Sequence, residues 1–439
     1  MINRKAFIFT VLLGSIIELR AQLPCNVLVG YWQTNWGKQV RLKDINSNYN
    51  VINIAFLEAG GGDGNHDNNS VSALKLTVTD NANLLADIPV VQNQGKKVLI
   101  SIGGATGSFK LSSTSDITTF VEKVKTIIQT YGLDGLDLDL ERSIYLKQVS
   151  GGTISNPEVH IANMISALQQ LLAWYQTTYS KKMILTLVPE VAYTVGGLSN
   201  YMSNTYGASY LPIIEALKND IDLVMVQLYN ASGGSYGLDN AIYYHGTVDF
   251  ILSQTEAMIK GFTCKNGKGV YSGLKPAQVA VCLPAQTKAS TAGYISPSNV
   301  SAALNYLRGV GPKPGSYTLQ KAGGYPDLGG MATWSINLDA DSAYVFANNF
   351  QNIFPSCLTT SIEEKKETSL KIYPNPARNQ INVEIANSIG QVIKIYTVSG
   401  QLVLQKTIES SSIIIDISEL SVGFYHIQIG TTSKKIIVE

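Results

Sequence analysis

Acidic side chains recur at every second position in one short stretch of the chain, residues 133–141. In the sequence LDGLDLDLE, Asp137, Asp139 and Glu141 alternate with leucines, which is the period-two pattern of a strand with one apolar face. Three carboxylates on one strand face are costly unless they are paired or protonated. An exposed edge strand would show the same alternation, whereas a calcium loop favours glycine and polar spacers over leucines. We therefore interpret the stretch as carboxylates held for chemistry, with Glu141 nearest the carboxyl end.

The surrounding chain alternates short β-branched runs with longer helical segments. Candidate strands are residues 27–32, 51–56, 97–103, 135–141, 183–188, 222–229, 278–284 and 330–336, and candidate helices include 116–131, 157–179 and 210–218. The helix at 157–179 is expected to have Asn156 as N-cap and Pro157 at its first position. Eight such units predict an α/β fold, a (β/α)8 TIM barrel with its active site at the carboxyl ends of the strands. The alternative is an open doubly wound sheet, but no G-x-G-x-x-G follows the first strand.

Both ends of the chain differ from this pattern. Residues 1–21 are typical of a secretory signal peptide, because a basic start precedes an apolar run at 6–17 that is too short to span a bilayer. We assign residues 22–358 to the barrel and the polar stretch 359–369 to a linker. Residues 370–439 predict a small all-β sandwich, from alternating runs at 381–385, 392–396, 402–407, 413–417, 423–429 and 434–438. We expect a secreted protein with no membrane span.

The composition limits the classes of binding partner that we expect. The formal net charge is +1 and 15% of residues are charged, which gives no electrostatic reason to expect nucleic acid or an anionic membrane. The four cysteines, Cys25, Cys264, Cys282 and Cys357, form no C-x-x-C pair, and the four histidines are scattered. We therefore predict no metal site and no cofactor. A Cys25–Cys357 disulfide would join the two ends of the barrel domain, and Cys282 suits a buried free thiol.

The acidic strand resembles a known family signature. Asp134, Asp137, Asp139 and Glu141 read D-x-x-D-x-D-x-E, as in glycoside hydrolase family 18, the chitinases and endo-β-N-acetylglucosaminidases. Ser101-Ile102-Gly103-Gly104 looks like the S-x-G-G of that family, and residues 225–230 resemble the M-x-Q-x-Y-N of its chitinase D-like and plant-type branch. Trp334 stands where the family keeps its pocket-floor tryptophan. Together these motifs span residues 26 to about 355.

The resemblance implies a catalytic role for each acid except Asp134, which falls on the leucine parity and is expected to be structural. Glu141 would be the general acid, and Asp139 would raise its pKa and orient the acetamido N–H of the substrate. Asp137 would share a proton or hydrogen bond with Asp139, and Tyr229 would hydrogen-bond the acetamido carbonyl. The acetamido oxygen of the substrate itself would attack, which gives an oxazolinium intermediate and net retention.

Substrate-binding residues are expected near these acids: Gln227, Trp334, Tyr31, Gly104, Asn230 and Met225. Trp32 could also line the groove. Polar filling of the barrel would equally account for Gln227 and Tyr229, and core packing would account for Trp334. Loop tyrosines either stack on sugar rings or are scattered on the surface, namely Tyr201, Tyr206, Tyr210, Tyr236, Tyr243 and Tyr244.

The leading hypothesis is a secreted, monomeric chitinase that cuts β-1,4 linkages of chitin or a related N-acetylglucosamine-containing glycan. An endo-β-N-acetylglucosaminidase that trims N-glycans shares the acidic signature. A catalytically inactive chitin-binding lectin is the non-enzymatic alternative, although such proteins usually lose the acid that is present here as Glu141.

The tail has its own resemblance. Residues 370–376 (LKIYPNP), Gly423-Phe424-Tyr425 and the closing run 434–438 resemble the type A C-terminal sorting domain of the type IX secretion system. This implies that the type IX machinery is a partner and that the protein is released or attached at the cell surface. A carbohydrate-binding module would need exposed aromatics, and the tail has no tryptophan and only Tyr373, Tyr396, Phe424 and Tyr425.

Overall fold

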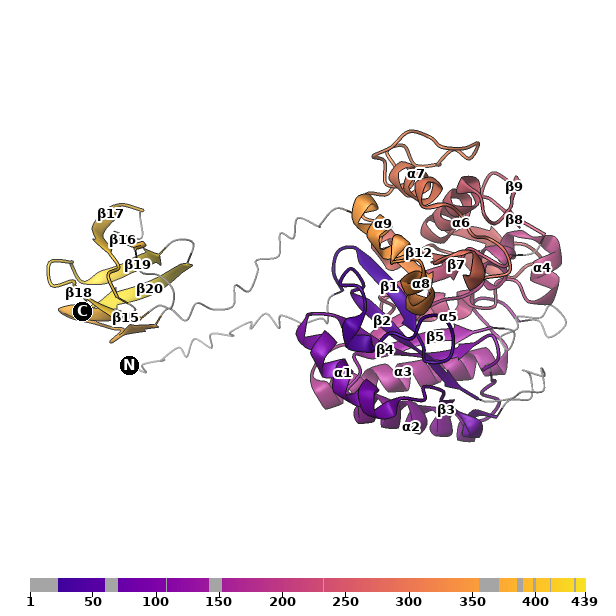
Figure 1. Cartoon of the computed structure of the whole chain (residues 1–439), viewed down its shortest axis with the longest axis horizontal. Coiled ribbons are helices and arrows are strands. Elements are labelled where there is room, and N and C mark those ends of the chain that lie inside the picture. The colour runs from indigo at the N-terminus through magenta and orange to yellow at the C-terminus, as the bar shows by residue number, and fades with distance from the viewer. Residues whose placement is uncertain are drawn as a thin grey trace, which may run out of the picture. The chain divides into compact units, whose positions relative to one another are not determined.

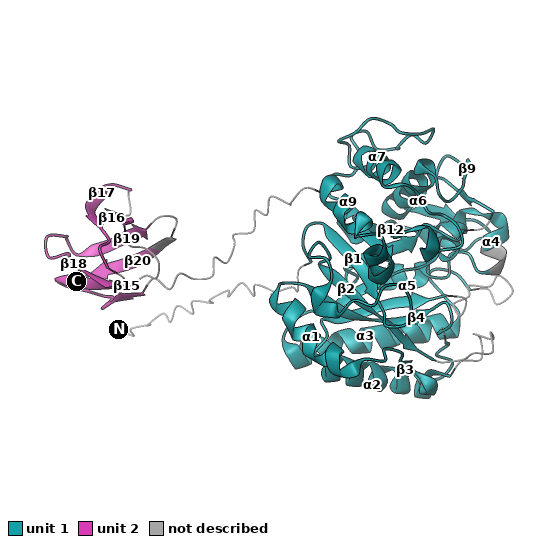
Figure 2. Ribbon diagram, in the orientation of Figure 1, with its two compact units in different colours: residues 1–357 teal, residues 358–439 magenta. Residues whose placement is uncertain are grey.

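The computed structural model describes residues 23–59, 70–107, 109–141, 152–231, 233–354, 371–384, 390–397, 400–410, 412–429 and 432–439. The chain forms two compact units, residues 1–357 and 358–439 (Figure 2). The predicted signal peptide, the predicted linker and Cys357 lie outside the described residues, so these predictions stay predictions.

Unit 1 is a closed barrel of eight parallel strands, which confirms the predicted TIM barrel (Figure 1). The strands in chain order are β1 (Val27–Trp32), β2 (Val51–Glu58), β4 (Lys97–Gly104), β5 (Gly135–Leu140), β6 (Ile184–Leu187), β7 (Leu223–Gln227), β12 (Val279–Pro284) and β13 (Gly330–Trp334). Each begins and ends within two residues of its prediction. The barrel closes because β1 pairs with both β2 and β13, with Val27 opposite Gly330 in the register. A short strand β3 (Lys75–Leu76) adds antiparallel to β2.

Leucines and acids of β5 lie on opposite faces of the strand, as the sequence predicted. Leu136, Leu138 and Leu140 are buried in the large apolar cluster that joins the barrel to its surrounding helices. A separate, smaller cluster fills the barrel interior, with Val29, Leu99 and Met225 among its members. The acids of β5 therefore share the inside of the barrel with a thin apolar filling.

Helices surround the strands, as Figure 1 shows for α1 to α3 beside β4. Their bounds are α1 (Asn81–Asn93), α2 (Thr114–Tyr131), α3 (Val159–Tyr179), α4 (Asn200–Thr205), α5 (Leu211–Leu217), α6 (Val248–Lys260), α7 (Pro297–Leu307), α8 (Ile336–Asp341) and α9 (Val345–Ile353). Short 3-10 turns are η1 (Leu42–Asp44), η3 (Val71–Ala73), η4 (Val191–Tyr193), η5 (Val195–Leu198), η6 (Pro276–Gln278) and η7 (Thr287–Ala289), and small hairpins pair β8 (Ser235–Tyr236) with β9 (Ile242–Tyr243) and β10 (Phe262–Cys264) with β11 (Gly269–Tyr271).

The predicted start of α3 was wrong. The helix begins at Val159 with Glu158 at the N-cap, not with Asn156 and Pro157. The preceding turn is held by a distant loop, because Ile154 N donates to Lys268 O and Lys268 Nζ donates to Gly152 O. These tertiary contacts override the local capping signal.

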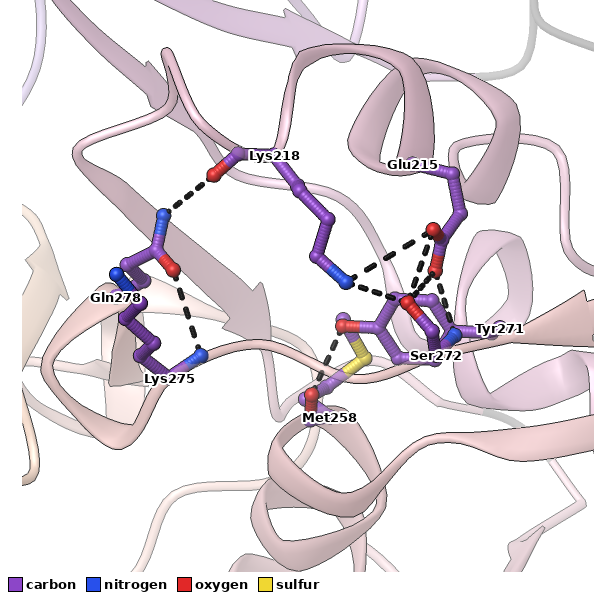
Figure 3. A network of polar contacts seen from close by, with 7 residues as sticks. All are labelled: Glu215, Lys218, Met258, Tyr271, Ser272, Lys275 and Gln278. Carbon is purple, nitrogen blue, oxygen red and sulfur yellow. Dashed lines mark hydrogen bonds and ion pairs between the residues drawn. The ribbon is translucent and has the colours of Figure 1, made fainter.

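Helix α5 is fixed to its neighbours by a polar network (Figure 3). The Glu215 carboxylate accepts hydrogen bonds from the backbone N–H and the hydroxyl of Ser272, the latter at 2.9 and 3.0 Å. Lys218 Nζ lies 3.9 Å from the same carboxylate and donates to the Ser272 hydroxyl. On the other side, Gln278 Nε2 donates to Lys218 O at 2.8 Å. The carboxyl-terminal end of this short helix is therefore held on two sides.

Unit 2 is the predicted antiparallel sandwich. One sheet contains β14 (Lys371–Tyr373), β15 (Gln380–Glu384) and β18 (Ser412–Asp416), and the other contains β17 (Leu402–Thr407), β16 (Val392–Thr397), β19 (Gly423–Ile429) and β20 (Thr432–Val438). Alternate residues of both sheets share one apolar core, for example Ile381, Ile395 and Ile427. Strand β14 was not predicted, because three residues before a Tyr-Pro step give too short an alternation.

Three of the four cysteines lie among the described residues. Cys25 is disulfide-bonded, whereas Cys264 and Cys282 are buried free thiols. The free state predicted for Cys282 is therefore confirmed. Among the described helices, none has the length and apolarity needed to cross a bilayer.

Candidate active site

Asp137 lies at the centre of a ring of hydroxyl groups inside the barrel. It is fully buried. Its Oδ2 accepts hydrogen bonds from Tyr31 at 2.9 Å and from Ser101 at 2.7 Å, and its Oδ1 accepts one from Thr186. Ser101 and Thr186 stand opposite Asp137 in the registers of β4 and β6, so the two adjacent strands deliver them. Both oxygens of Asp137 are thus satisfied by hydroxyls.

Gln227 joins the other two acids. Its Nε2 donates to Asp139 Oδ1 at 3.0 Å and lies 3.3 Å from Glu141 Oε1. The same nitrogen also donates to Val188 O at 3.1 Å. Asp139 is buried, whereas Glu141 follows the last residue of β5 and is partly exposed. The sequence therefore correctly placed Glu141 nearest the rim and Gln227 beside Asp139.

The electrostatics of the acids follow from burial and from one another. Burial raises the pKa of Asp137 to about 6, although the hydroxyls of Thr186, Ser101 and Tyr31 favour its charged form. The pKa of Asp139 is raised well above its ordinary value by burial first, and then by the charges of Glu141, Asp137 and Glu190. A buried carboxyl group beside other carboxyls is held near its protonated form, which suits a group that shares protons during a reaction.

Tyr229 lies close to the acids and to a thiol. Burial raises its pKa well above the ordinary value, followed by the charges of Cys282, Asp139 and Glu141 and a hydrogen bond with the Cys282 side chain. A thiol is a weak hydrogen-bond partner. The raised pKa keeps the phenol neutral, and its bond with the thiol is a weak one.

Aromatic rings form a layer at the carboxyl end of β13. Trp334 stacks on Phe56 with ring centroids 5.5 Å apart and planes 15° apart, and it also contacts Tyr31 at 5.8 Å and Trp36 at 6.1 Å. Trp334 is partly exposed, and Trp36 is 43% exposed. The two tryptophans therefore present apolar ring area to solvent beside the buried acids.

The two glycines that end β4 allow close approach. A Cβ on Gly103 would lie 2.2 Å from Asp139 O, and a Cβ on Gly104 would lie 2.8 Å from the Phe56 ring. Both have positive φ values, 114° and 77°. Gly104 thus contacts the ring under Trp334 through its backbone, and Gly103 lets β4 approach the acidic strand.

Three other aromatic or apolar residues near the acids are buried, in or around the barrel. Met225 is fully buried in the barrel interior, because it lies two residues before Gln227 on the inward side of β7. The Tyr31 side chain is buried and its hydroxyl binds Asp137, so it supports the acids from below. Trp32 packs outside the barrel and its indole N–H donates to Val40 O.

The side chains of Asn230 and Asp134 accept hydrogen bonds from the backbone of neighbouring segments. Asn230 Oδ1 accepts hydrogen bonds from Thr291 Oγ1 at 2.8 Å and Ala292 N at 3.1 Å, and its φ of 52° is one that asparagine tolerates. Asp134 Oδ2 accepts from Val98 N at 3.0 Å and from a glutamine side chain at 2.9 Å, at the opposite end of β5 from Glu141. Asp134 is structural, as its leucine parity indicated.

The loop tyrosines separate into exposed and buried groups. Tyr201 is 69% and Tyr244 is 59% exposed, so either ring is accessible to a ligand. Tyr243 packs edge-on against Tyr317. Tyr210 is fully buried and cannot stack on a sugar.

Sequence reasoning missed several residues around the acids. Thr186 lies on β6, and only the strand register reveals it as the partner of Asp137. Phe56 lies on β2 and stacks on Trp334 of β13, although these two strands are not paired. Trp36 follows β1 in a loop, where no periodicity marks it. Glu190 forms an isolated bridge with Gln227 just after β6. Among the described residues, no group of three His, Cys, Asp or Glu side chains is arranged to hold a metal ion.

Comparison with known proteins identifies the barrel. Residues 27–294 match the model of Glycosyl hydrolases family 18, and this range covers more than half of the chain. The chain belongs to glycosyl hydrolase family 18. The family 18 resemblance of the acidic strand is thereby confirmed.

Similar members of family 18 carry chitinase names. Chitinase D from Niallia circulans is 38% identical over 77% of this chain, and the match covers 63% of that relative. Chitinase ChiA from Flavobacterium johnsoniae is 31% identical over 84% of this chain but 25% of its own length. The chain thus spans less than two thirds of either relative. A crystal structure of a family GH18 chitinase from Chromobacterium violaceum is 29% identical, with a TM-score of 0.64 over 76% of this chain and 85% of that one.

The tail belongs to a second family. Residues 371–439 match the Secretion system C-terminal sorting domain. This confirms the resemblance to a type IX sorting domain and marks the chain for secretion by that system.

Proposed function

We propose that this family 18 protein is a chitinase that hydrolyses β-1,4 linkages between N-acetylglucosamine units. The observation that carries the proposal is the Gln227 amide between a buried Asp139 and a partly exposed Glu141, beside the exposed tryptophan faces. This arrangement offers one acid at the rim, a second acid below it and an apolar surface for a sugar ring. The chitinase names of similar proteins support the choice of substrate.

In the proposed mechanism Glu141 protonates the oxygen of the leaving sugar. Its carboxyl group lies just beyond β5 and is partly exposed, so a glycosidic oxygen can reach it from solvent. The acetamido oxygen of the substrate then attacks the anomeric carbon, and water opens the resulting oxazolinium ion with net retention. Glu141, now ionised, takes the proton from that water.

The remaining groups would hold the acetamido group for this attack. Asp139 accepts the acetamido N–H, and the growing positive charge of the oxazolinium ion favours the ionised form of this carboxyl group. Asp137 precedes Asp139 on β5, and its three hydroxyl donors stabilise the negative charge of the Asp137 carboxylate. The Tyr229 hydroxyl donates to the acetamido carbonyl oxygen in exchange for the Cys282 thiol.

The test is product analysis on chitin hexamer and on a high-mannose glycoprotein. We expect the wild-type protein to cut only the hexamer, and early NMR spectra to show the β-anomer first. Glu141→Gln should retain binding and lose roughly 10²–10⁴ in rate or more. Glu122→Gln, an exposed glutamate on α2, is the control and should retain full activity.

Other outcomes would decide against parts of the proposal. Cleavage of the glycoprotein alone would keep the barrel chemistry and identify an endo-β-N-acetylglucosaminidase. Binding of the hexamer without cleavage would identify a lectin. An α-anomer as first product would exclude the retaining mechanism.

A further inference from the structure

The hydrogen-bonded ladder between β5 and β6 stops just before Glu141. Val188 N donates to Leu138 O at 3.0 Å, and the next rung of a parallel ladder would join Leu140 N to Val188 O. Val188 O instead accepts the Gln227 side chain at 3.1 Å. The backbone N–H of buried Leu140 must therefore find another acceptor.

A side chain supplies that acceptor. Leu140 N donates to the Tyr210 hydroxyl at 2.7 Å, and the same hydroxyl lies 3.5 Å from Leu138 O. Tyr210 is fully buried, so water does not compete for this bond. The Tyr210 hydroxyl thus takes the place of the missing rung, because it bonds Leu140 N just before Glu141 and lies near Leu138 O.

Tyr210 is itself held firmly. Its backbone N–H donates to Tyr193 O at 2.9 Å, and its ring lies 6.4 Å from the Tyr193 ring. It immediately precedes α5, which the Glu215–Ser272 contacts of Figure 3 fix to the segment that follows β11. The position of the hydroxyl is therefore determined by the scaffold and not by the substrate.

We propose that Tyr210 is a positioning residue for Glu141. Its hydroxyl holds the Leu140 backbone so that the carboxyl group that follows points at the leaving oxygen. The inference rests on the proposed function, because it assigns a role within the same site. Tyr210 touches no substrate, and its loss weakens proton delivery while attack by the acetamido oxygen continues.

Tyr210→Phe tests this with two substrates, because it removes the hydroxyl and keeps the ring. Chitin hexamer needs the general acid for its leaving sugar. The 4-nitrophenyl glycoside of chitobiose has a leaving group that departs with little protonation. We expect kcat to fall roughly tenfold to a hundredfold on the hexamer and less than about threefold on the aryl glycoside. The ratio of the two rates does not depend on how much of the variant is folded.

Tyr175→Phe is the matched control. The Tyr175 hydroxyl is also buried and donates to Leu133 O at 3.1 Å, just before the other end of β5. This variant should keep the wild-type ratio of the two rates. Equal losses on both substrates in Tyr210→Phe, or the same selective loss in Tyr175→Phe, would overturn the inference. If the wild-type protein cuts neither substrate, the proposed function itself fails.

Discussion

Gln227 donates a hydrogen bond to Asp139 across 88 residues of sequence, at 3.0 Å and out of contact with bulk water. The amide is neutral and lies between two groups that would otherwise repel each other. It therefore allows Asp139 and Glu141 to remain close without a cation between them.

Replacing Gln227 by leucine should damage the site more than the fold. A hydrogen bond to a charged group contributes about 1.5–3 kcal/mol, so we expect kcat/KM to fall roughly tenfold to a hundredfold. Steady-state kinetics on chitin hexamer measures this. Gln92→Leu is the control, because the Gln92 amide also joins a carboxylate and a backbone carbonyl, but at the Asp134 end of β5. An equal loss in the control would show that the effect is not specific to the site.

The stability of the protein should depend on pH through Asp139. Its pKa is raised by burial and then by Glu141, so the folded state holds the proton more tightly than the unfolded chain does. Below the unfolded pKa both states are protonated, and Asp139 costs the folded state nothing. The loss of folding stability grows as the pH rises from the unfolded pKa to the folded pKa. We therefore expect Asp139→Asn to gain unfolding free energy over wild type between pH 4 and pH 7, measured by chemical denaturation. A difference that stays constant with pH would contradict the raised pKa.

Trp36 should contribute to binding and not to the chemical step. Its ring is 43% exposed and lies 6.1 Å from that of Trp334. If the two rings bind successive sugars, Trp36→Ala should raise KM for chitin hexamer roughly 2- to 12-fold, as expected for about 0.5–1.5 kcal/mol, with kcat unchanged. Val310→Ala, an exposed apolar residue elsewhere, should leave both constants unchanged. A fall in kcat alone would place Trp36 in the reaction itself.

Glu256 should matter for stability alone. This buried carboxylate of α6 accepts hydrogen bonds from the hydroxyls of Tyr317 and Tyr325, both at 2.7 Å, and from the backbone of Gln320 and Lys321. Glu256→Gln places an amide NH2 group against these donors and should cost about 3 kcal/mol of unfolding free energy. Denaturant titration measures the loss, with Glu122→Gln as an exposed control. At temperatures where the variant is folded, kcat on the hexamer should equal that of wild type.

The sequence predicted what depends on local periodicity. The alternation around Asp137, Asp139 and Glu141 specified both the strand and the face that each acid takes, and β-branched runs specified the other strands of the barrel. Gln227 followed from its parity with Tyr229. These predictions succeeded because neighbours along one strand determine them.

Local periodicity in the sequence could not predict contacts between distant segments. The hydroxyl ring around Asp137 depends on the register of β4 and β6, and Tyr210 gave no sign that it replaces a ladder rung. The full burial of Met225 inside the barrel was not evident, because parity gives direction but not depth. The start of α3 was missed for the same kind of reason, since Lys268, over a hundred residues away, binds the turn before the helix.

The pairing of β1 with β13 joins the first and the last strand of the barrel. Asn26 at the start of the barrel donates to Leu328 O, 302 residues further along the chain. A growing chain that ends before β13 has an open sheet edge and lacks Trp334, although its acids have long been synthesised. The closed barrel and its aromatic layer therefore depend on residues from both ends of unit 1.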